Sequence, residues 1–237
     1  MLRDNSKRAR AARLVFMLLA ASSAALLLVA LAAPALSANP ADMPPRAVAF
    51  YASFSLLSFI VIALFIGSYI ALIMWLRRAY YNLHQLPGIN PEYSDGWAAG
   101  AWFVPFINFV RPFTIMREVW QDTQLAALGR VAEPATILGW WWAACVLRLV
   151  IGRITWALSR GGPETSSLSS SDIVSASWEA GAHLLVGVLT WYVIGRCMRF
   201  EEQLAVRQQI EQLGQPAPEA PAFLAEEQAN YGQPEGY

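Results

Sequence analysis

The feature that most constrains this chain is a set of long runs with few or no charged residues. Residues 14–36 and 48–76 contain no Asp, Glu, Lys or Arg, and residues 137–158 and 173–198 contain few. About 20 apolar residues in a helix cross the roughly 30 Å hydrocarbon core of a bilayer. With 56% hydrophobic and 14% charged residues, the 237-residue chain does not have the composition of a soluble globular protein. The sequence predicts an all-α integral membrane fold with four transmembrane helices.

The two ends of the chain differ from this membrane part. A basic segment, residues 1–13, precedes the first apolar run. The 23 residues of that run, 14–36, exceed the usual apolar core of about 7 to 15 residues in a signal peptide, which favours a retained anchor over a cleaved signal. Residues 200–213 repeat apolar positions at helical spacing and predict a cytoplasmic helix. Residues 214–237, rich in Pro, Glu, Gln and Gly, predict a disordered tail.

Residues 96–110 do not fit a full span. They are apolar for 15 residues, about 22 Å as a helix, and they are interrupted by Pro105 and followed by Pro112. A short span and a re-entrant or interfacial hairpin between the second and third helices are both open. Residues 113–128 then show an apolar and a polar side, which predicts a helix in the headgroup plane that begins near Pro112 and stops at Gly129.

The distribution of basic residues predicts the orientation. Most Lys and Arg residues lie in the N-terminal segment, between residues 77 and 136, and after the last span. The 37–47 and 159–172 loops contain only Arg46 and Arg160. Basic residues favour the cytoplasmic side, so both termini are predicted to be cytoplasmic. A full crossing by residues 96–110 would place the basic end of the last span outside, which favours the hairpin.

A motif in the middle of the chain resembles a known family. It reads W-F-x-P-x-x-N-x-x-x-P-x-x-x-x-x-E-x-W and comprises Trp102, Phe103, Pro105, Asn108, Pro112, Glu118 and Trp120. This text is similar to the bacterial multi-pass membrane family called domain of unknown function 4328, and residues 48–199 form the membrane domain that resembles it. The resemblance implies a bacterial cytoplasmic (inner) membrane protein, and it implies no activity or substrate.

The motif residues form the first candidate site, with a structural and a binding interpretation. The prolines Pro105 and Pro112 donate no backbone hydrogen bond, so a helix here leaves carbonyls unpaired at membrane depth. The Asn108 amide is expected to satisfy such groups and to clamp a rigid hairpin. The alternative is a broken helix that lines a polar cavity for a headgroup or solute. A scaffold predicts a hairpin sealed by side chains, whereas a binding protein predicts a water-filled cavity that contacts Asn108 and the intramembrane arginines.

Ionisable residues inside the last two spans form the second candidate site. They are Arg148, Arg153, Glu179 and His183. Such groups are costly in hydrocarbon and usually face protein or water. Counting from the outer ends places Arg153 level with Glu179 and Arg148 level with His183, a height that would let a neutral His183 accept from Arg148. Positions 148 and 153 point about 140° apart around a helix, so both arginines cannot face the last span, and we expect the Arg153–Glu179 ion pair. Interhelical pairing is favoured over a relay or transport site.

Several function classes find no support in the sequence. Equal numbers of basic and acidic residues, 17 each, give no case for nucleic-acid binding, and the two cysteines suggest no metal site. No nucleophile, metal or phosphate motif is present, so no catalytic residue, cofactor or metal is expected and the protein is not predicted to be an enzyme. The favoured function is an accessory or scaffolding module that contacts lipid and a membrane or cytoplasmic protein. The alternative is a small transporter or a lipid- or headgroup-binding protein.

The topology can be tested with reporter fusions. Fusions after residues 40 and 165 should report an extracytoplasmic position, and fusions after residues 90, 130 and 215 a cytoplasmic one, because the arginines flank the cytoplasmic ends. Paired alkaline phosphatase and fluorescent protein reporters measure both outcomes. A cytoplasmic signal at residue 165 would contradict the four-helix scheme.

Overall fold

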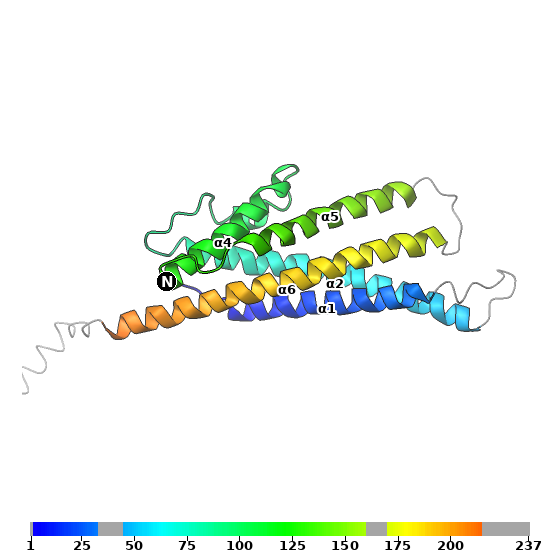
Figure 1. Ribbon diagram of the computed structural model, residues 1–237, viewed down its shortest axis with the longest axis horizontal. Coiled ribbons are helices and arrows are strands. Elements are labelled where there is room, and N and C mark those ends of the chain that lie inside the picture. Colours follow the sequence, from blue (N-terminus) through cyan, green and yellow to red (C-terminus); the bar gives the residue numbers. More distant parts are fainter. Residues whose placement is uncertain (1, 33–44, 160–169, 215–237) are drawn as a thin grey trace, which may run out of the picture. The chain divides into compact units, whose positions relative to one another are not determined.

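The computed structural model describes residues 2–32, 45–159 and 170–214, and within these ranges it contains helices and no strands (Figure 1). The four long helices are α1 (Ser6–Leu31), α2 (Pro45–Leu83), α5 (Thr136–Ser159) and α6 (Ser170–Leu213). Between α2 and α5 lie α3 (Trp97–Gly100), the 3-10 helix η2 (Ile107–Phe109) and α4 (Arg111–Leu128). All four long helices are long and apolar enough to cross a membrane, which confirms the predicted fold class. The packing described below concerns the compact unit that ends at Leu204.

The helices extend beyond the apolar runs that predicted them. The 39 residues of α2 and the 44 of α6 correspond to about 58 and 66 Å, more than the hydrocarbon core requires. Hydropathy marks only the part of a helix that hydrocarbon surrounds, whereas basic residues such as Arg8 and Arg10 are good helix formers in water. For this reason α1 begins at Ser6 rather than at residue 14. Residues 33–36 of the first predicted span and the predicted tail beyond Gly214 lie outside the described residues.

Large apolar side chains cover the outside of the bundle. Exposed fractions reach 69% for Leu28, 72% for Phe59 and 54% for Ile154, on three different long helices. Burying apolar surface away from water stabilises a protein by about 25 cal/mol per Å², and side chains left exposed to water would not contribute this stabilisation. Contiguous apolar surface of this kind marks a face that is covered by another apolar medium. The outward side chains therefore agree with a surrounding of lipid hydrocarbon.

Helices α1 and α6 approach closely at two glycines. A Cβ atom at Gly187 would lie 3.1 Å from the Ala20 Cβ atom and 3.2 Å from the Phe16 carbonyl oxygen. About two helical turns further along α6, Gly195 leaves room for the Arg13 guanidinium. A Cβ atom at Gly195 would lie 3.1 Å from that group. Small residues let helix backbones approach in membranes, where packing replaces the hydrophobic effect as the driving force. These two glycines therefore define where α1 packs on α6.

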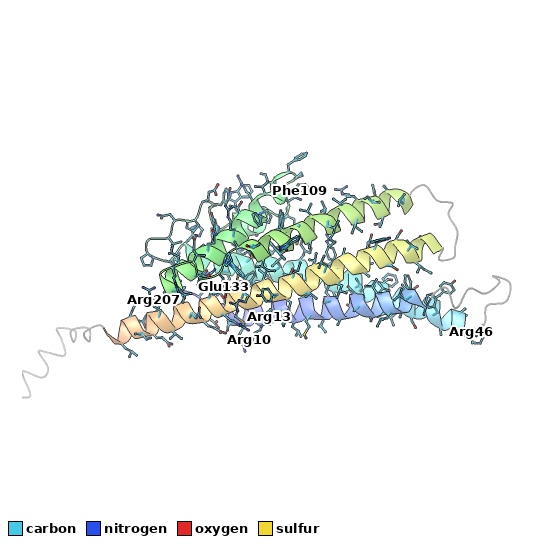
Figure 2. All side chains as sticks on the ribbon, in the orientation of Figure 1. Arg10, Arg13, Arg46, Phe109, Glu133 and Arg207 are labelled. Atoms are coloured by element: carbon cyan, nitrogen blue, oxygen red, sulfur yellow. The ribbon has the colours of Figure 1, made fainter. Side chains whose placement is uncertain are left out.

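Polar contacts join the chain segments at one end of the bundle. The Asn5 amide donates to the Glu201 Oε1 atom at 3.0 Å and to the Trp75 carbonyl at 3.5 Å. On the connection between α4 and α5, Glu133 forms an ion pair with Arg196 of α6. Figure 2 shows Arg10 and Glu133 toward this end and Arg46 at the opposite end. The N-terminal residues and the α2–α5 connection thus share one end, as the predicted topology requires, while the side of the membrane stays a prediction.

The glycine contact can be tested with a matched pair of variants. Gly187→Val should destabilise the protein by about 1 to 3 kcal/mol, because its side chain must displace the backbone of α1. Gly181→Val is the control, since a Cβ atom at Gly181 of the same helix meets nothing within 4 Å. The midpoint of thermal unfolding in detergent measures the difference. Equal midpoints for the two variants would show that the close approach at Gly187 does not stabilise the bundle.

Candidate functional site

The helical path breaks between α3 and α4. Pro105 has no N–H, and the next residue, Phe106, has a positive φ of 64°, which is rare outside glycine. The Ile107 amide donates to the Pro105 carbonyl at 2.8 Å and the Asn108 amide to the Val104 carbonyl at 3.0 Å. These two bonds close a compact turn. Residues 101–110 therefore turn the chain between α3 and α4. We call residues 96–112 the hairpin segment and residues 101–110 its tip.

Helix α4 has the ends that the sequence predicts. Pro112 lies in its first turn, where the missing N–H has no partner to lose. At the other end, Gly129 adopts a left-handed conformation with φ 71°, and its amide donates to the Leu125 carbonyl at 2.9 Å. Glycine adopts this conformation at no steric cost. Both predicted boundaries are confirmed.

The hairpin tip lies against the first half of α5. The Trp142 indole N–H donates to the Phe109 carbonyl at 3.0 Å, and Figure 2 shows Phe109 beside α5 and away from Glu133. Trp142 is six residues into α5, or about 9 Å along its axis. Phe103 and Phe106 are 76% and 86% exposed. Phenylalanine side chains that are this exposed are expected in apolar surroundings. That the tip enters the bilayer stays a prediction.

A cavity of about 420 Å³ lies between the hairpin segment, α2 and α5. Most of its lining is apolar or aromatic, and polar groups come from residues that include Tyr69, Asn108 and Arg148. The lining comprises Phe65, Ile66, Tyr69, Ile70 and Ile73 of α2, Trp102, Phe103, Asn108 and Phe109 of the hairpin segment, and Trp142, Cys145, Val146, Arg148 and Leu149 of α5. Its volume falls within the range of about 300 to 1,000 Å³ that is usual for small-molecule sites. The fold thus brings Trp102 and Asn108, from the first candidate site, together with Arg148 from the second.

Arg148, rather than the expected Arg153, reaches the last helix. One of its terminal nitrogens lies 3.3 Å from His183 Nε2, and the guanidinium lies 4.2 Å from the centre of the Phe65 ring. An arginine only donates, so a hydrogen bond here requires His183 Nε2 to be the acceptor of a neutral imidazole. The equal height of Arg148 and His183 is confirmed, and Arg148 is the arginine that faces α6. Within the described ranges no carboxylate forms an ion pair with Arg148, and its Nε atom is buried without a partner.

Two further buried polar atoms of the cavity residues have no partner. They are the Trp102 indole nitrogen and the Asn108 Oδ1 atom. The expectation that the Asn108 amide satisfies freed backbone groups is wrong. The backbone amides of Ile107 and Asn108 already donate within the turn, so they need no side-chain acceptor. The Asn108 side chain is left to face the cavity.

The expected ion pair between Arg153 and Glu179 is not formed. Glu179 instead accepts a short hydrogen bond from the Thr155 hydroxyl, and the Arg153 side chain is exposed. Positions 148 and 153 are five residues apart and therefore point about 140° apart around a helix. Because Arg148 faces α6, Arg153 has to face away from it. A threonine hydroxyl on the correct face takes the place of the arginine.

Comparison with known families agrees with the resemblance in the motif. The sequence pattern of the family described as domain of unknown function (DUF4328) matches residues 39–199, well over half of the chain. The chain belongs to this family. The matched region includes the hairpin segment, the cavity and both candidate sites, while α1 precedes it. No curated protein and no solved structure matches the chain.

Within the family motif, Glu118 has a structural position. Its two carboxylate oxygens accept from the Tyr80 hydroxyl at 2.6 Å and from the Glu92 amide at 3.2 Å. The Tyr80 hydroxyl in turn accepts from the Tyr93 amide at 3.1 Å. His84 adds to this network, since its two ring nitrogens each lie 2.9 Å from a backbone carbonyl. Glu118 therefore fixes the connection after α2 onto α4.

The motif residue Trp120 also anchors a connection. Its buried indole N–H donates to the Glu133 carbonyl at 3.2 Å, and the Gln124 side chain bonds the same residue through its amide and carbonyl groups. Glu133 then pairs with Arg196. Sequence reasoning missed Gln124 and Glu133, because neither lies in the motif or in an apolar run. The ion pair between Glu133 and Arg196 joins residues 63 positions apart, and no local spacing in the sequence indicates it.

The carboxylates of α4 do not assemble a catalytic group with His84. Burial, and after it the neighbouring Glu118, raises the pKa of Asp122 above its usual value. Glu118 and His84 are each engaged with backbone or tyrosine groups of the connection. Among the described residues no group of three His, Cys, Asp or Glu side chains could hold a metal ion. The cavity beside Asn108 and Arg148 is the candidate binding site.

The role of Glu118 and Tyr80 predicts a stability effect. Tyr80→Phe removes the hydroxyl that joins Glu118 to the Tyr93 amide, and should cost about 1 to 3 kcal/mol of unfolding free energy. Tyr81→Phe is the control, because the neighbouring hydroxyl forms no hydrogen bond in the described structure and Tyr81 contacts Arg3 with its ring. Limited proteolysis of the connection, with thermal unfolding, measures the effect. Equal protection in both variants would argue against the network.

Proposed function

We propose that the protein binds an amphipathic, lipid-like molecule in the cavity between the hairpin segment, α2 and α5. The observation that supports this proposal is a cavity of about 420 Å³ lined by Trp102, Asn108 and Arg148, each of which has a buried polar atom without a partner. An unpaired buried polar group costs about 1 to 3 kcal/mol. A ligand that supplies the missing partners recovers this cost, so the pattern favours an occupied site.

The rim of the cavity supports entry from the bilayer. Ile66 and Ile70 are each 55% exposed, and Phe103 is 76% exposed. Water-soluble ligands usually enter past polar groups, whereas these side chains present hydrocarbon. Molecules already dissolved in the membrane reach such an opening without crossing a polar barrier. The ligand that fits is therefore one with an apolar body and a polar group.

This proposal places binding ahead of scaffolding. A scaffold needs a hairpin that side chains seal, whereas a cavity lies next to Asn108 and Arg148. Its lining is mostly apolar and does not include Arg153, so it fits an amphipathic ligand better than the water-filled pathway expected for a transporter. The proposal places the protein in the bacterial cytoplasmic membrane with both termini cytoplasmic, as its basic residues favour. It assigns no chemical step, since the cavity lining contains no carboxylate or histidine that could exchange a proton with a ligand.

The proposal is tested by filling the cavity. Cys145→Phe adds a ring in the cavity and should remove most bound amphiphile, because the ligand and the ring compete for the same 420 Å³. Leu147→Phe adds the same ring on the same helix, at a side chain that is 50% exposed and does not line the cavity. Native mass spectrometry of protein purified from its own membranes measures the bound lipid mass.

The two variants give distinct outcomes. We expect a defined lipid adduct on the wild type and on Leu147→Phe, and its loss from Cys145→Phe. Thermal unfolding of the three proteins checks that each is folded. Equal adducts on both variants would show that lipid binds elsewhere, and folded proteins without any adduct or stabilisation by added lipid would overturn the binding function.

A further inference from the structure

We infer that the ligand of this cavity carries an anionic head, a carboxylate or a phosphate, that pairs with Arg148, and an alkyl chain that lies along α2 and α5. This inference rests on the proposed binding function and specifies its ligand class. It starts from a charge that the described protein leaves without a counter-charge. The sequence alone did not indicate whether a ligand would carry a positive or a negative charge.

The position of Arg148 makes its charge costly. It is the thirteenth residue of α5, which places it about 18 Å along the helix axis, near the middle of the 24-residue helix. The described ion pairs are formed by Arg196 with Glu133 and by Arg207 with Glu211, and neither involves this residue. Its neighbours, the neutral His183 and the Phe65 ring, orient the guanidinium and do not neutralise it. An arginine at this depth normally pairs with an anion or reaches water.

The polar groups of the cavity residues favour an acceptor. The buried Nε atom of Arg148 and the indole nitrogen of Trp102 are N–H donors without an acceptor among the described residues, and the Asn108 Oδ1 atom is an acceptor without a donor there. Arginine binds carboxylate and phosphate with paired hydrogen bonds, which are stronger than neutral ones. A cationic head would meet the Arg148 charge, and a hydroxyl head would leave that charge unpaired. The charge of Arg148, which the described residues leave unpaired, therefore selects an anion.

The remainder of the lining fits an alkyl chain. Ile70, Ile73 and Leu149 supply aliphatic surface, and Tyr69 and Trp142 supply ring faces. The exposed Ile66 and Ile70 leave the cavity open at the side, so a chain longer than the cavity continues into hydrocarbon. A small inorganic anion would satisfy Arg148 and leave this apolar surface uncovered. Head and chain together are required.

The inference is tested with four amphiphiles of one chain length and the intact protein in nonionic detergent. The probes are decanoate, decyl phosphate, decanol and decylammonium, with inorganic phosphate as a head without a chain. We expect decanoate or decyl phosphate to bind about tenfold or more tightly than decanol, decylammonium to bind least, and inorganic phosphate alone not to bind. Native mass spectrometry titrations give each apparent Kd as a mole fraction in the micelle. The two anionic probes distinguish a carboxylate from a phosphate head.

Variants on α5 assign the preference to one residue. Arg148→Met should bind decanoate and decanol with similar affinity, whereas Arg153→Met, which removes an exposed arginine from the same helix, should keep the wild-type order. Arg148→Lys retains the charge and should keep anions ahead of decylammonium. If Arg148→Met does not fold, the affinities of Arg148→Lys and of the wild type for the four amphiphiles decide whether the ligand head is anionic.

The outcomes separate this inference from the proposed function. Similar affinities of the wild type for decanoate, decanol and decylammonium would overturn the anionic head and leave amphiphile binding in place. An anion preference that persists in folded Arg148→Met would also overturn the inference. Failure of every amphiphile to bind would overturn the proposed function. If inorganic phosphate bound as tightly as decyl phosphate, the claim that the ligand needs an alkyl chain would be overturned.

Discussion

Hydrocarbon offers no hydrogen-bond partner, so a polar group at membrane depth has to find one within the protein. Most of the bundle follows this constraint. The Trp141 indole donates to Thr190 at 2.9 Å, Thr190 donates to the Val186 carbonyl at 2.7 Å, and Glu179 accepts from Thr155. Some buried polar atoms of the described residues still lack a partner, among them Ser23 Oγ and Trp75 Nε1 as well as atoms of Trp102, Asn108 and Arg148. At the last three residues these atoms coincide with a cavity that another molecule could fill.

The sequence predicted the parts of the fold that depend on local pattern. Apolar length predicted the four helices, proline and glycine predicted the ends of α4, and axial counting predicted that Arg148 and His183 lie at one height. Axial counting failed for Arg153 and Glu179, because equal height does not fix the direction in which a side chain points. The angle between positions 148 and 153 allows only one of them to face α6, and the sequence alone did not say which.

The hairpin segment shows a second limit of sequence reasoning. Pro105 and Pro112 predicted a break, and the break is present. How its turn satisfies its own amides depends on the conformation of Phe106, which no residue pattern specified. The expectation for Asn108 failed for this reason. The cavity itself depends on packing between segments some forty residues apart in the sequence, and such contacts leave no mark in local spacing.

The place of Arg13 has a consequence for how the molecule is assembled. Its guanidinium lies 4.6 Å from the Trp191 ring and in the space left by Gly195, so the surface that covers it belongs to α6. A ribosome makes α1 first and α6 last. Throughout synthesis of the intervening helices, this arginine therefore has to stay near the aqueous boundary or against other protein. The first helix can dock fully only when the last one arrives, and the bundle closes by joining the two ends of its own chain.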